Sequence, residues 1–396
     1  MSLQDTPRAE RLHIGLFGKR NSGKSSLVNA LTGQEIALVS DVAGTTTDPV
    51  YKAMEIHGIG PCVFIDTAGF DDEGELGAMR VAKTRDALDR TDIAILVFGG
   101  GDPAMELAWA AELKKRKTPI VAVINKIDIL GDTSQLQSLI REKIGRVPLL
   151  VSALEKKGID KIREAIIYHL PEDYDAVRIT GNLVEDGDLV LLVMPQDIQA
   201  PKGRLILPQV QTLRELLDTK CIVMSTTTDK MDEALQAMAR PPKLIITDSQ
   251  VFKTVYEKKP KESMLTSFSV LFAQYKGDLA FFAESAAVIE SLTEKSKVLI
   301  AEACTHAPLH EDIGRVKLPR MLKKKVGEGL TIHHVSGVDF PTDLTDYDLI
   351  IQCGACMFNR KYVLTRVESA QKQGVPMSNY GVVLAYLSGI LDKIVW

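Results

Sequence analysis

Apolar runs alternate with amphipathic stretches between residue 12 and about residue 170. The runs that are typical of strands buried on both faces of a sheet are HIGLFG, CVFID, IAILVFGG, IVAVINK and PLLVSA. Because helical patterns separate these runs, they predict a parallel sheet that is covered by helices. A polar stretch with turn signals follows over residues 171–188 and predicts a linker or a connecting hairpin. We therefore place the first domain limit between residues 174 and 175.

Two further sets of alternating strands and helices follow this stretch. The first set, over residues 175–262, has the apolar runs LVLLVMP, CIVMST and KLIITDS and the helical patterns QTLRELLDTK and DEALQAMAR. The second set, over residues 263–396, has the runs SFSVLF, KVLIAEAC, LTIHHVS and DLIIQC and the helical patterns FFAESAAVIESL and RVKLPRMLKKKVG. The chain is therefore expected to be an α/β protein with one larger part and two smaller ones. The pattern leaves open whether the two later sets form one sheet or two domains.

The composition is typical of a soluble globular protein, because 45% of the 396 residues are hydrophobic and 25% are charged. The formal net charge of −4 gives no overall basic field, which disfavours nucleic acid as a partner. The chain has no run of about eighteen apolar residues for a membrane span, and its first residues contain no apolar segment of signal-peptide length. We therefore expect a cytoplasmic protein with no membrane partner.

A phosphate-binding loop is predicted at residues 18–25, GKRNSGKS, which fit the pattern G-x-x-x-x-G-K-[ST]. The motif lies between a predicted strand and the helical stretch SSLVNAL, where backbone N–H groups can surround the phosphates of a nucleotide. Lys24 is expected to reach the β and γ phosphates, and the Ser25 hydroxyl to bind Mg²⁺. The residues of this loop that we expect to contact the nucleotide are Gly18, Asn21, Ser22, Gly23, Lys24, Ser25 and Ser26.

Three more motifs follow in order at the ends of predicted strands. In DTAG, Asp66 is placed for the magnesium shell and the Gly69 N–H for the γ-phosphate. In NKID, which begins with Asn125 and Lys126, the Asp128 carboxylate can accept two hydrogens from guanine that adenine does not offer. Ser152 and Ala153 complete the base pocket. Each motif also occurs by chance, but together they favour a GTPase that binds GTP and GDP.

The stretch AGTTTD at residues 43–48 resembles the GTTRD switch of the TrmE-Era-EngA group of GTPases. The resemblance makes Thr46 a Mg²⁺ ligand and completes the expected catalytic set of Lys24, Thr46, Asp66 and Gly69. The position of Asn21 resembles that of the K⁺-dependent members, which implies that Asn21 is a potassium ligand. Phe70 stands where Ras-like enzymes have the glutamine that orients water, so we expect slow intrinsic turnover that K⁺ stimulates.

Three of the five cysteines lie in the last quarter of the chain. Cys353 and Cys356 form a C-x-x-C pair after the run DLIIQ, and Cys304 follows the run KVLIAEA. Carboxyl ends of parallel strands meet at one sheet edge, so these thiolates could bind a soft metal centre together. A zinc clip, a redox pair or buried small residues are alternatives to an iron–sulfur cluster. Cys62 and Cys221 lie in apolar runs and are expected in the core.

A TrmE-like GTPase followed by C-x-H and C-x-x-C resembles the HydF family of [FeFe]-hydrogenase maturation GTPases. The resemblance implies a [4Fe-4S] cluster held by Cys304, Cys353 and Cys356. Gln352 stands where the family pattern has histidine, and a glutamine amide is a poor iron ligand. The fourth ligand is therefore open; the candidates are His306, His310 and Glu311. His333 and His334, at the predicted end of a strand, are expected to be structural.

The resemblance also implies a scaffold that assembles and delivers the two-iron subcluster precursor. Its partners would be the radical-SAM maturases HydE and HydG and the apo-[FeFe]-hydrogenase, and GTP hydrolysis would time their exchange. Residues 1–174 would be the P-loop GTPase domain, 175–262 a dimerisation domain and 263–396 the cluster-binding domain of a homodimer or higher oligomer. The alternative is a translation-linked GTPase for tRNA modification or ribosome assembly. It would need a basic RNA-binding module, and the run of lysines at 323–325 is short.

Overall fold

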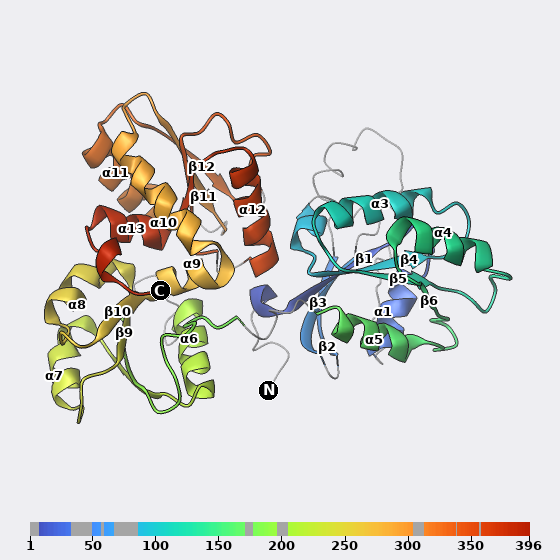
Figure 1. The fold of residues 1–396 in the computed structure, drawn as a ribbon, viewed down its shortest axis with the longest axis horizontal. Helices are drawn as coiled ribbons and strands as arrows, with labels where there is room; N and C mark the ends of the chain where they lie inside the picture. Colours follow the sequence, from blue (N-terminus) through green and yellow to red (C-terminus); the bar gives the residue numbers. More distant parts are fainter. Residues whose placement is uncertain are drawn as a thin grey trace. The chain divides into compact units, whose positions relative to one another are not determined.

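The chain divides into two compact units, Met1–Tyr174 and Asp175–Trp396, which are described here one after the other (Figure 1). The computed structural model describes residues 8–32, 50–56, 59–66, 86–170, 177–195, 205–303, 313–337, 339–355 and 358–396. No helix among these residues is long and apolar enough to cross a membrane.

The first unit is built on a six-stranded sheet with the order β2-β3-β1-β4-β5-β6. Its strands are β1 Leu12–Phe17, β2 Val50–Ile56, β3 Gly60–Asp66, β4 Ile93–Phe98, β5 Ile120–Ile124 and β6 Leu149–Leu150. All neighbours pair in parallel except β2 and β3, which are antiparallel. The central strands β1, β4 and β5 are buried throughout, which explains their uninterrupted apolar sequences.

Helices cover both faces of this sheet (Figure 1). Helices α1 (Lys24–Thr32) and α5 (Ile159–Tyr168) share one hydrophobic core with β1 and β3. Helices α3 (Ala104–Lys115) and α4 (Ser134–Ile144) share the other with β4 and β5. The sheet is therefore a three-layer α/β structure whose strand ends are free to form a site.

The second unit contains two four-stranded parallel sheets, with the orders β10-β9-β7-β8 and β12-β11-β13-β14. The first sheet has β7 Leu189–Val193, β8 Ile222–Thr226, β9 Leu244–Thr247 and β10 Met264–Ser267. The second has β11 Lys297–Glu302, β12 Thr331–Ser336, β13 Leu349–Gln352 and β14 Met377–Asn379. The helices are α6 Leu207–Asp218, α7 Met231–Gln236, α8 Phe252–Lys258, α9 Phe268–Lys276, α10 Leu279–Ala287, α11 Leu318–Val326, α12 Arg360–Lys372 and α13 Tyr380–Leu387. The predicted fold class is confirmed.

One hydrophobic core joins the two sheets of this unit. It contains Leu191 and Ile245 from the first sheet together with Leu299 and Ile350 from the second. The same core contains side chains of α9, α10 and α13. The two sheets are therefore separate layers of one packed body.

The strand predicted at SFSVLF is wrong, because helix α9 begins there at Phe268. Ser267 caps the helix through its side-chain oxygen, which accepts a hydrogen bond from the Val270 N–H. The helix is apolar on several sides since Leu271 and Phe272 face one core while Val270 faces the other. Such a short apolar run does not distinguish a buried helix from a buried strand. The strand in this region is β10, just before the helix, and it pairs with β9.

Candidate functional site

The loop between β1 and α1 has the backbone conformation that its glycines permit. Gly18 has a φ of 155° and Gly23 a φ of 88°. A Cβ atom on Gly18 would lie 2.5 Å from the Val97 carbonyl oxygen, and one on Gly99 would lie 2.6 Å from the Ser22 Cα. The loop therefore packs closely on the end of β4, and side chains at either glycine would force it away.

The Lys24 ammonium lies inside this loop. Its Nζ donates hydrogen bonds to the Gly18 carbonyl at 2.5 Å and to the Lys19 carbonyl at 2.8 Å, and the side chain is buried. Helix α1 begins at this residue, with the Leu27 N–H donating to the Gly23 carbonyl. The loop thus combines a positive side chain with the N-terminus of a helix, which is an arrangement that binds phosphate.

Asn125 links the phosphate loop to the predicted base pocket. Its side chain is buried, and Nδ2 donates a hydrogen bond to the Ser22 carbonyl at 3.0 Å. Its Oδ1 accepts a hydrogen bond from the Ala153 N–H, also at 3.0 Å. One side chain therefore fixes two loops that follow different strands, and both loops belong to the site predicted from the sequence.

We expect Asn125→Ala to lower the free energy of unfolding of the GTPase domain by about 1–3 kcal/mol, since two buried backbone groups would lose their partner. GDP affinity should fall as well, because the two loops would no longer be held together. Denaturant unfolding and GDP titration measure the two effects. Asn125→Asp is the matched comparison, because it keeps the acceptor for Ala153 and removes the donor for Ser22. Unchanged stability in both variants would contradict this role.

The predicted base-pocket residues differ in exposure, since Ser152 and Ala153 are buried. Asp128 is exposed, and Lys126 has a φ of 64° in the turn before it. The Ser152 Oγ accepts a hydrogen bond from the Glu155 N–H at 3.1 Å, which closes the loop that carries Ala153. The Glu155 carboxylate and, more weakly, Asp128 raise the pKa of Lys157 in the same loop. Asp128, which is predicted to bind guanine, is therefore accessible to a ligand from solvent.

Glu106 of α3 supports the phosphate loop and was not predicted from the sequence. This buried carboxylate accepts a hydrogen bond from the Lys19 N–H at 3.2 Å and lies 3.9 Å from the Lys19 Nζ. A glutamate in a helix belongs to no motif, so the sequence gives no signal for this contact.

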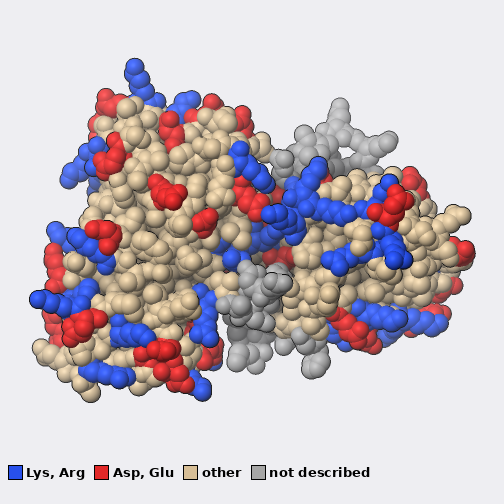
Figure 2. Space-filling model, in the orientation of Figure 1, with Lys and Arg blue, Asp and Glu red and all other residues tan. Residues whose placement is uncertain are grey.

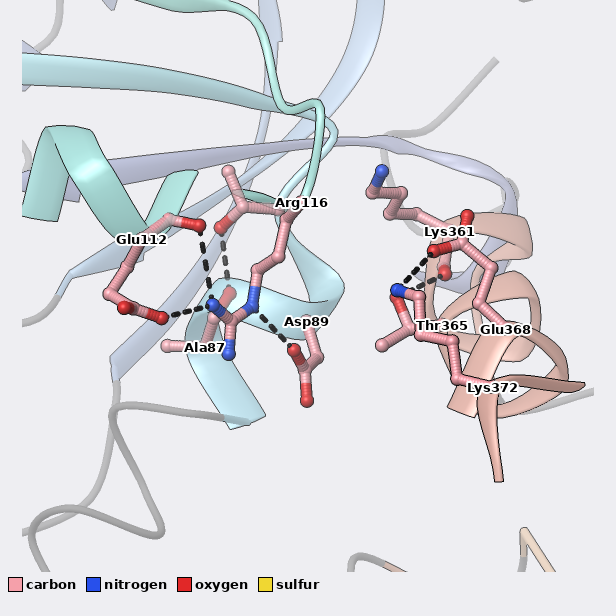
Figure 3. Close-up of polar contacts among 9 residues, drawn as sticks. Ala87, Asp89, Glu112, Arg116, Lys361, Thr365, Glu368 and Lys372 are labelled. Atoms are coloured by element: carbon pink, nitrogen blue, oxygen red, sulfur yellow. Dashed lines mark hydrogen bonds and ion pairs between the residues drawn. The ribbon is translucent and has the colours of Figure 1, made fainter. Parts of the chain in front are cut away.

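The predicted switch residues are only partly described. Asp66 ends β3, in register with Leu16 of β1, and its side chain is outside the described residues, as are Thr46, Gly69 and Phe70. The next described residues begin at 86. There, Asp89 accepts a hydrogen bond from Arg116 Nε at 2.8 Å (Figure 3). Arg116 Nη1 also donates to Glu112 at 2.8 Å. This ion-pair cluster links the segment of residues 86–90 to α3.

Cys353 lies at the carboxyl edge of the second sheet of residues 175–396. It follows β13, and its Sγ accepts hydrogen bonds from the Ala303 N–H at 3.0 Å and the Ala355 N–H at 3.4 Å. Ala303 follows β11 and directly precedes Cys304 in the sequence. Cys304, Cys356, His306, His310 and Glu311 lie outside the described residues. Within the described part of the chain, no group of three or more His, Cys, Asp or Glu could hold a metal ion.

Gln352 and the two neighbouring histidines have defined surroundings. Gln352 ends β13 and is buried, and its Oε1 has no hydrogen-bond partner among the described residues. His333 and His334 lie within β12, not at its end as predicted. His333 Nδ1 is 3.2 Å from the Tyr347 hydroxyl, and His334 Nε2 is 3.0 Å from the Gly314 carbonyl. Both histidines therefore make contacts within the fold.

The prediction that Cys62 and Cys221 are core residues is confirmed. Both are buried, and their thiols donate to backbone carbonyls, Cys62 to Gly60 and Cys221 to Glu185. Burial raises the pKa of the Cys221 thiol, which keeps it in the unreactive protonated form.

Three family models match the chain. Residues 13–126 match the model of a 50S ribosome-binding GTPase. Residues 179–277 match the hydrogen maturase F dimerization domain, and residues 280–396 match the hydrogen maturase F tetramerization domain.

Curated relatives match about two fifths of the chain. The tRNA modification GTPase MnmE of Laribacter hongkongensis is 38% identical over 161 residues, which are 40% of this chain and 34% of that protein. GTPase Der of Wolinella succinogenes is 37% identical over 166 residues, or 39% of this chain and 35% of that protein. The chain thus spans about a third of the length of these relatives.

Solved structures match the chain at low similarity. A variant of Aquifex aeolicus Era bound to GDP.AlF4- is 21% identical, with a TM-score of 0.35 over 57% of this chain and 98% of that one. The G domain of the T. maritima FeoB iron transporter is 23% identical, with a TM-score of 0.32 over 41% and 99% of the two chains. These scores are too low to support a functional inference.

The six-stranded sheet, the glycine-dependent phosphate loop and the asparagine that joins it to the base pocket define a P-loop GTPase, in agreement with the family model over residues 13–126. The remaining two parts match hydrogen maturase F along almost their whole length. The chain belongs to the hydrogen maturase F (HydF) family, which confirms the resemblance drawn from its sequence.

Proposed function

We propose that this hydrogenase maturation GTPase binds a [4Fe-4S] cluster through Cys304, Cys353 and Cys356. The observation that carries the proposal is the pair of backbone N–H groups that donate to Cys353 Sγ. Such bonds favour a thiolate over a thiol and are typical of sulfur atoms that ligate iron. One donor is Ala303, the last described residue after β11, and Cys304 directly follows it in the sequence.

The protein residues supply three thiolates and leave a fourth position for His306, His310 or Glu311. When bound, the cluster would supply an iron site at which a metal precursor can dock. In this role the chain is a scaffold that receives the two-iron precursor made with HydE and HydG and delivers it to the apo-[FeFe]-hydrogenase. Thiolate ligands of this kind need a reducing compartment, which supports a cytoplasmic location.

Anaerobic reconstitution with iron and sulfide tests the cluster directly. We expect about four irons and about four sulfides per chain, the content of a [4Fe-4S] cluster. Zinc bound without sulfide would instead favour a zinc clip. A chain that binds neither metal would contradict the site.

GTP hydrolysis would time the exchange of partners and leave the chemistry of the cargo to the metal centre. In this proposal Ser25 and Thr46 bind Mg²⁺, Asp66 completes the magnesium shell, and Asp128 selects guanine. The Gly69 N–H and Lys24 meet the γ-phosphate. The geometry of Lys24 within its loop supports this assignment.

We expect hydrolysis to be faster in K⁺ than in Na⁺, and Asn21→Ala to erase the difference. Asn21 is exposed in the phosphate loop with a φ of 60°, a conformation that asparagine tolerates, and its amide oxygen is a suitable ligand for potassium. Phosphate release measured in each salt gives the ratio. Equal rates for the unmodified chain in both salts would exclude a potassium requirement.

The first sheet of the second unit offers a surface for a second copy of the chain. Strand β8 ends this sheet, and one of its edges pairs with no strand of the described residues. Exposed apolar side chains lie on β8 and on α6: Ile222 of β8 is 59% exposed, and Leu217 and Val210 of α6 are 50% and 45% exposed. The match to a dimerization domain supports pairing of two copies along β8.

Ile222→Lys should therefore convert the dimer to a monomer at low micromolar concentration, because a charge would be buried in the paired edge. Light scattering after size exclusion measures the mass. Ile167→Lys is the matched control, because Ile167 is 42% exposed on α5 of the GTPase domain. A dimer that survives Ile222→Lys but not Ile167→Lys would place the interface elsewhere.

A translation-linked function has less support. Residues 179–396 match hydrogen maturase models along almost their whole length, and only the GTPase domain matches a ribosome-binding family. On the face in Figure 2, basic and acidic side chains are interspersed over the second unit. RNA that co-purifies with a colourless chain would favour the translation-linked alternative.

A further inference from the structure

A buried lysine holds the loop that carries the C-x-x-C pair. Lys276 is the last residue of α9 and is only 2% exposed. Its ammonium donates hydrogen bonds to the Phe358 carbonyl at 3.0 Å and to the Ala355 carbonyl at 3.4 Å. These two carbonyls lie on either side of Cys356 in the sequence. Lys276 therefore binds the backbone of the loop at two carbonyls, one before and one after Cys356 in the sequence.

A second contact joins the same helix end to the same loop. Arg360, the first residue of α12, donates a hydrogen bond from Nε to the Tyr275 carbonyl at 3.0 Å. The cysteine loop is thus fixed to the end of α9 at three backbone carbonyls. Helix α9 lies within the stretch that matches the dimerization domain, whereas the loop lies within the tetramerization match.

One of the residues that Lys276 binds, Ala355, has a strained backbone conformation. Ala355, between the two cysteines, has a φ of 50°, which is costly for a residue with a Cβ atom. Its N–H donates to Cys353 Sγ, and its carbonyl accepts from Lys276. A residue in this conformation persists only where its surroundings fix it on both sides. The hydrogen bond from Lys276 fixes the carbonyl side of Ala355, and the hydrogen bond to Cys353 Sγ fixes its N–H side.

The charge of Lys276 adds a second effect. A [4Fe-4S] core with three thiolate ligands carries net negative charge, and reduction adds one more. In a buried setting the field of an ammonium group is screened much less than at the surface. It therefore stabilises the reduced form more than the oxidised form.

We propose that Lys276 is a positioning residue that fixes the cysteine loop and raises the reduction potential of a cluster bound there. This inference rests on the cluster site proposed above. It assigns to the end of α9, far from the cysteines in the sequence, control over both the geometry and the charge of the site.

Two substitutions separate the two effects. Lys276→Met removes the charge and the hydrogen bonds but keeps the length of the side chain. Lys276→Gln removes the charge and keeps an N–H donor. Lys372→Met is the control, because the side chain of Lys372 is 72% exposed on α12. The chains are reconstituted with iron and sulfide, and the cluster is titrated with dithionite while its paramagnetic resonance signal is followed.

We expect both Lys276 variants to be harder to reduce by at least tenfold in the equilibrium constant, or about 59 mV for one electron. Lys276→Met should also lose at least half of its iron, whereas Lys276→Gln should retain most of it. Lys372→Met should match the unmodified chain. In all variants GTP hydrolysis and the circular dichroism spectrum should be unchanged.

Failure of the inference is distinct from failure of the proposed function. If the unmodified chain takes up no iron, the cluster site is wrong, and this inference falls with it. If it takes up iron and both Lys276 variants keep its iron content and potential, the cluster site stands and the role of Lys276 is refuted. If both variants lose the circular dichroism signal of the folded chain together with GTP hydrolysis, Lys276 is needed for folding and is not a positioning residue.

Discussion

Replacing Lys24 by alanine is expected to reduce GTP hydrolysis by on the order of 10²–10³-fold, the usual cost of losing one preorganised donor to a developing negative charge. The ammonium is already inside the phosphate loop, held by the carbonyls of Gly18 and Lys19. The Lys24 Nζ can exchange these carbonyl partners for a phosphate oxygen without leaving the loop. Among the described residues, Lys24 is the one buried lysine in the phosphate loop. Single-turnover phosphate release measures the loss.

The matched control is Lys114→Ala, because Lys114 lies on α3 and donates to the Lys143 carbonyl at the surface. Its rate should stay within about twofold of the unmodified chain, the range expected of an exposed substitution. Lys24→Ala should also keep its iron content after reconstitution, since Lys24 is in the GTPase domain and the three cysteines proposed to bind the cluster follow residue 300. Loss of iron in Lys24→Ala would contradict two separate sites.

The strands of the GTPase domain were predictable because of how they are buried. Strands β1, β4 and β5 are covered on both faces, so every position is apolar and the runs stand out. The edge strand β2 and the three-residue strand β14 have mixed sequences, VYKAMEI and MSN, and give no such signal. Their place in the sheets depends on pairing with distant strands, which the local pattern does not report.

The segment around Ser267 shows where the same signal misleads. An apolar run that faces two cores at once has no polar side, so neither the period of a helix nor that of a strand can be seen. The cap formed by Ser267 is the local feature that decides for a helix. A serine before an apolar run is common, however. It indicates a helix only when its side-chain oxygen accepts a hydrogen bond from an N–H of the first turn, which the sequence does not report.

Sequence motifs identify the residues that contact a ligand. They identify less well the supporting residues that hold the ligand-binding residues in position. Asn125 was predicted as part of the nucleotide site, but its bridge between two loops depends on the distance between strand ends. Glu106 and Lys276 were not predicted. A charged residue in a helix is usually read as solvent-facing, and only the packing shows that both are buried.

Replacing Cys353 by serine is expected to remove most of the cluster. Cys353 is the one proposed thiolate whose surroundings are described, and its Sγ accepts two backbone hydrogen bonds at the edge where β11 and β13 end. A serine oxygen is harder and less readily deprotonated, so the remaining two thiolates would hold a [4Fe-4S] core weakly. Iron and sulfide content and the visible absorbance after anaerobic reconstitution measure the loss.

Cys221→Ala is the control for this result, because Cys221 is buried in the core and its raised pKa keeps it protonated. It should keep the full cluster content of the unmodified chain. The Cys353→Ser chain should also keep its GTP hydrolysis rate, which shows that the loss of iron is local to the cysteine site. If Cys353→Ser retains its iron while Cys221→Ala loses it, the thiolate that ligates iron is Cys221, which directly precedes β8. The C-x-x-C pair would then be a feature of the fold alone.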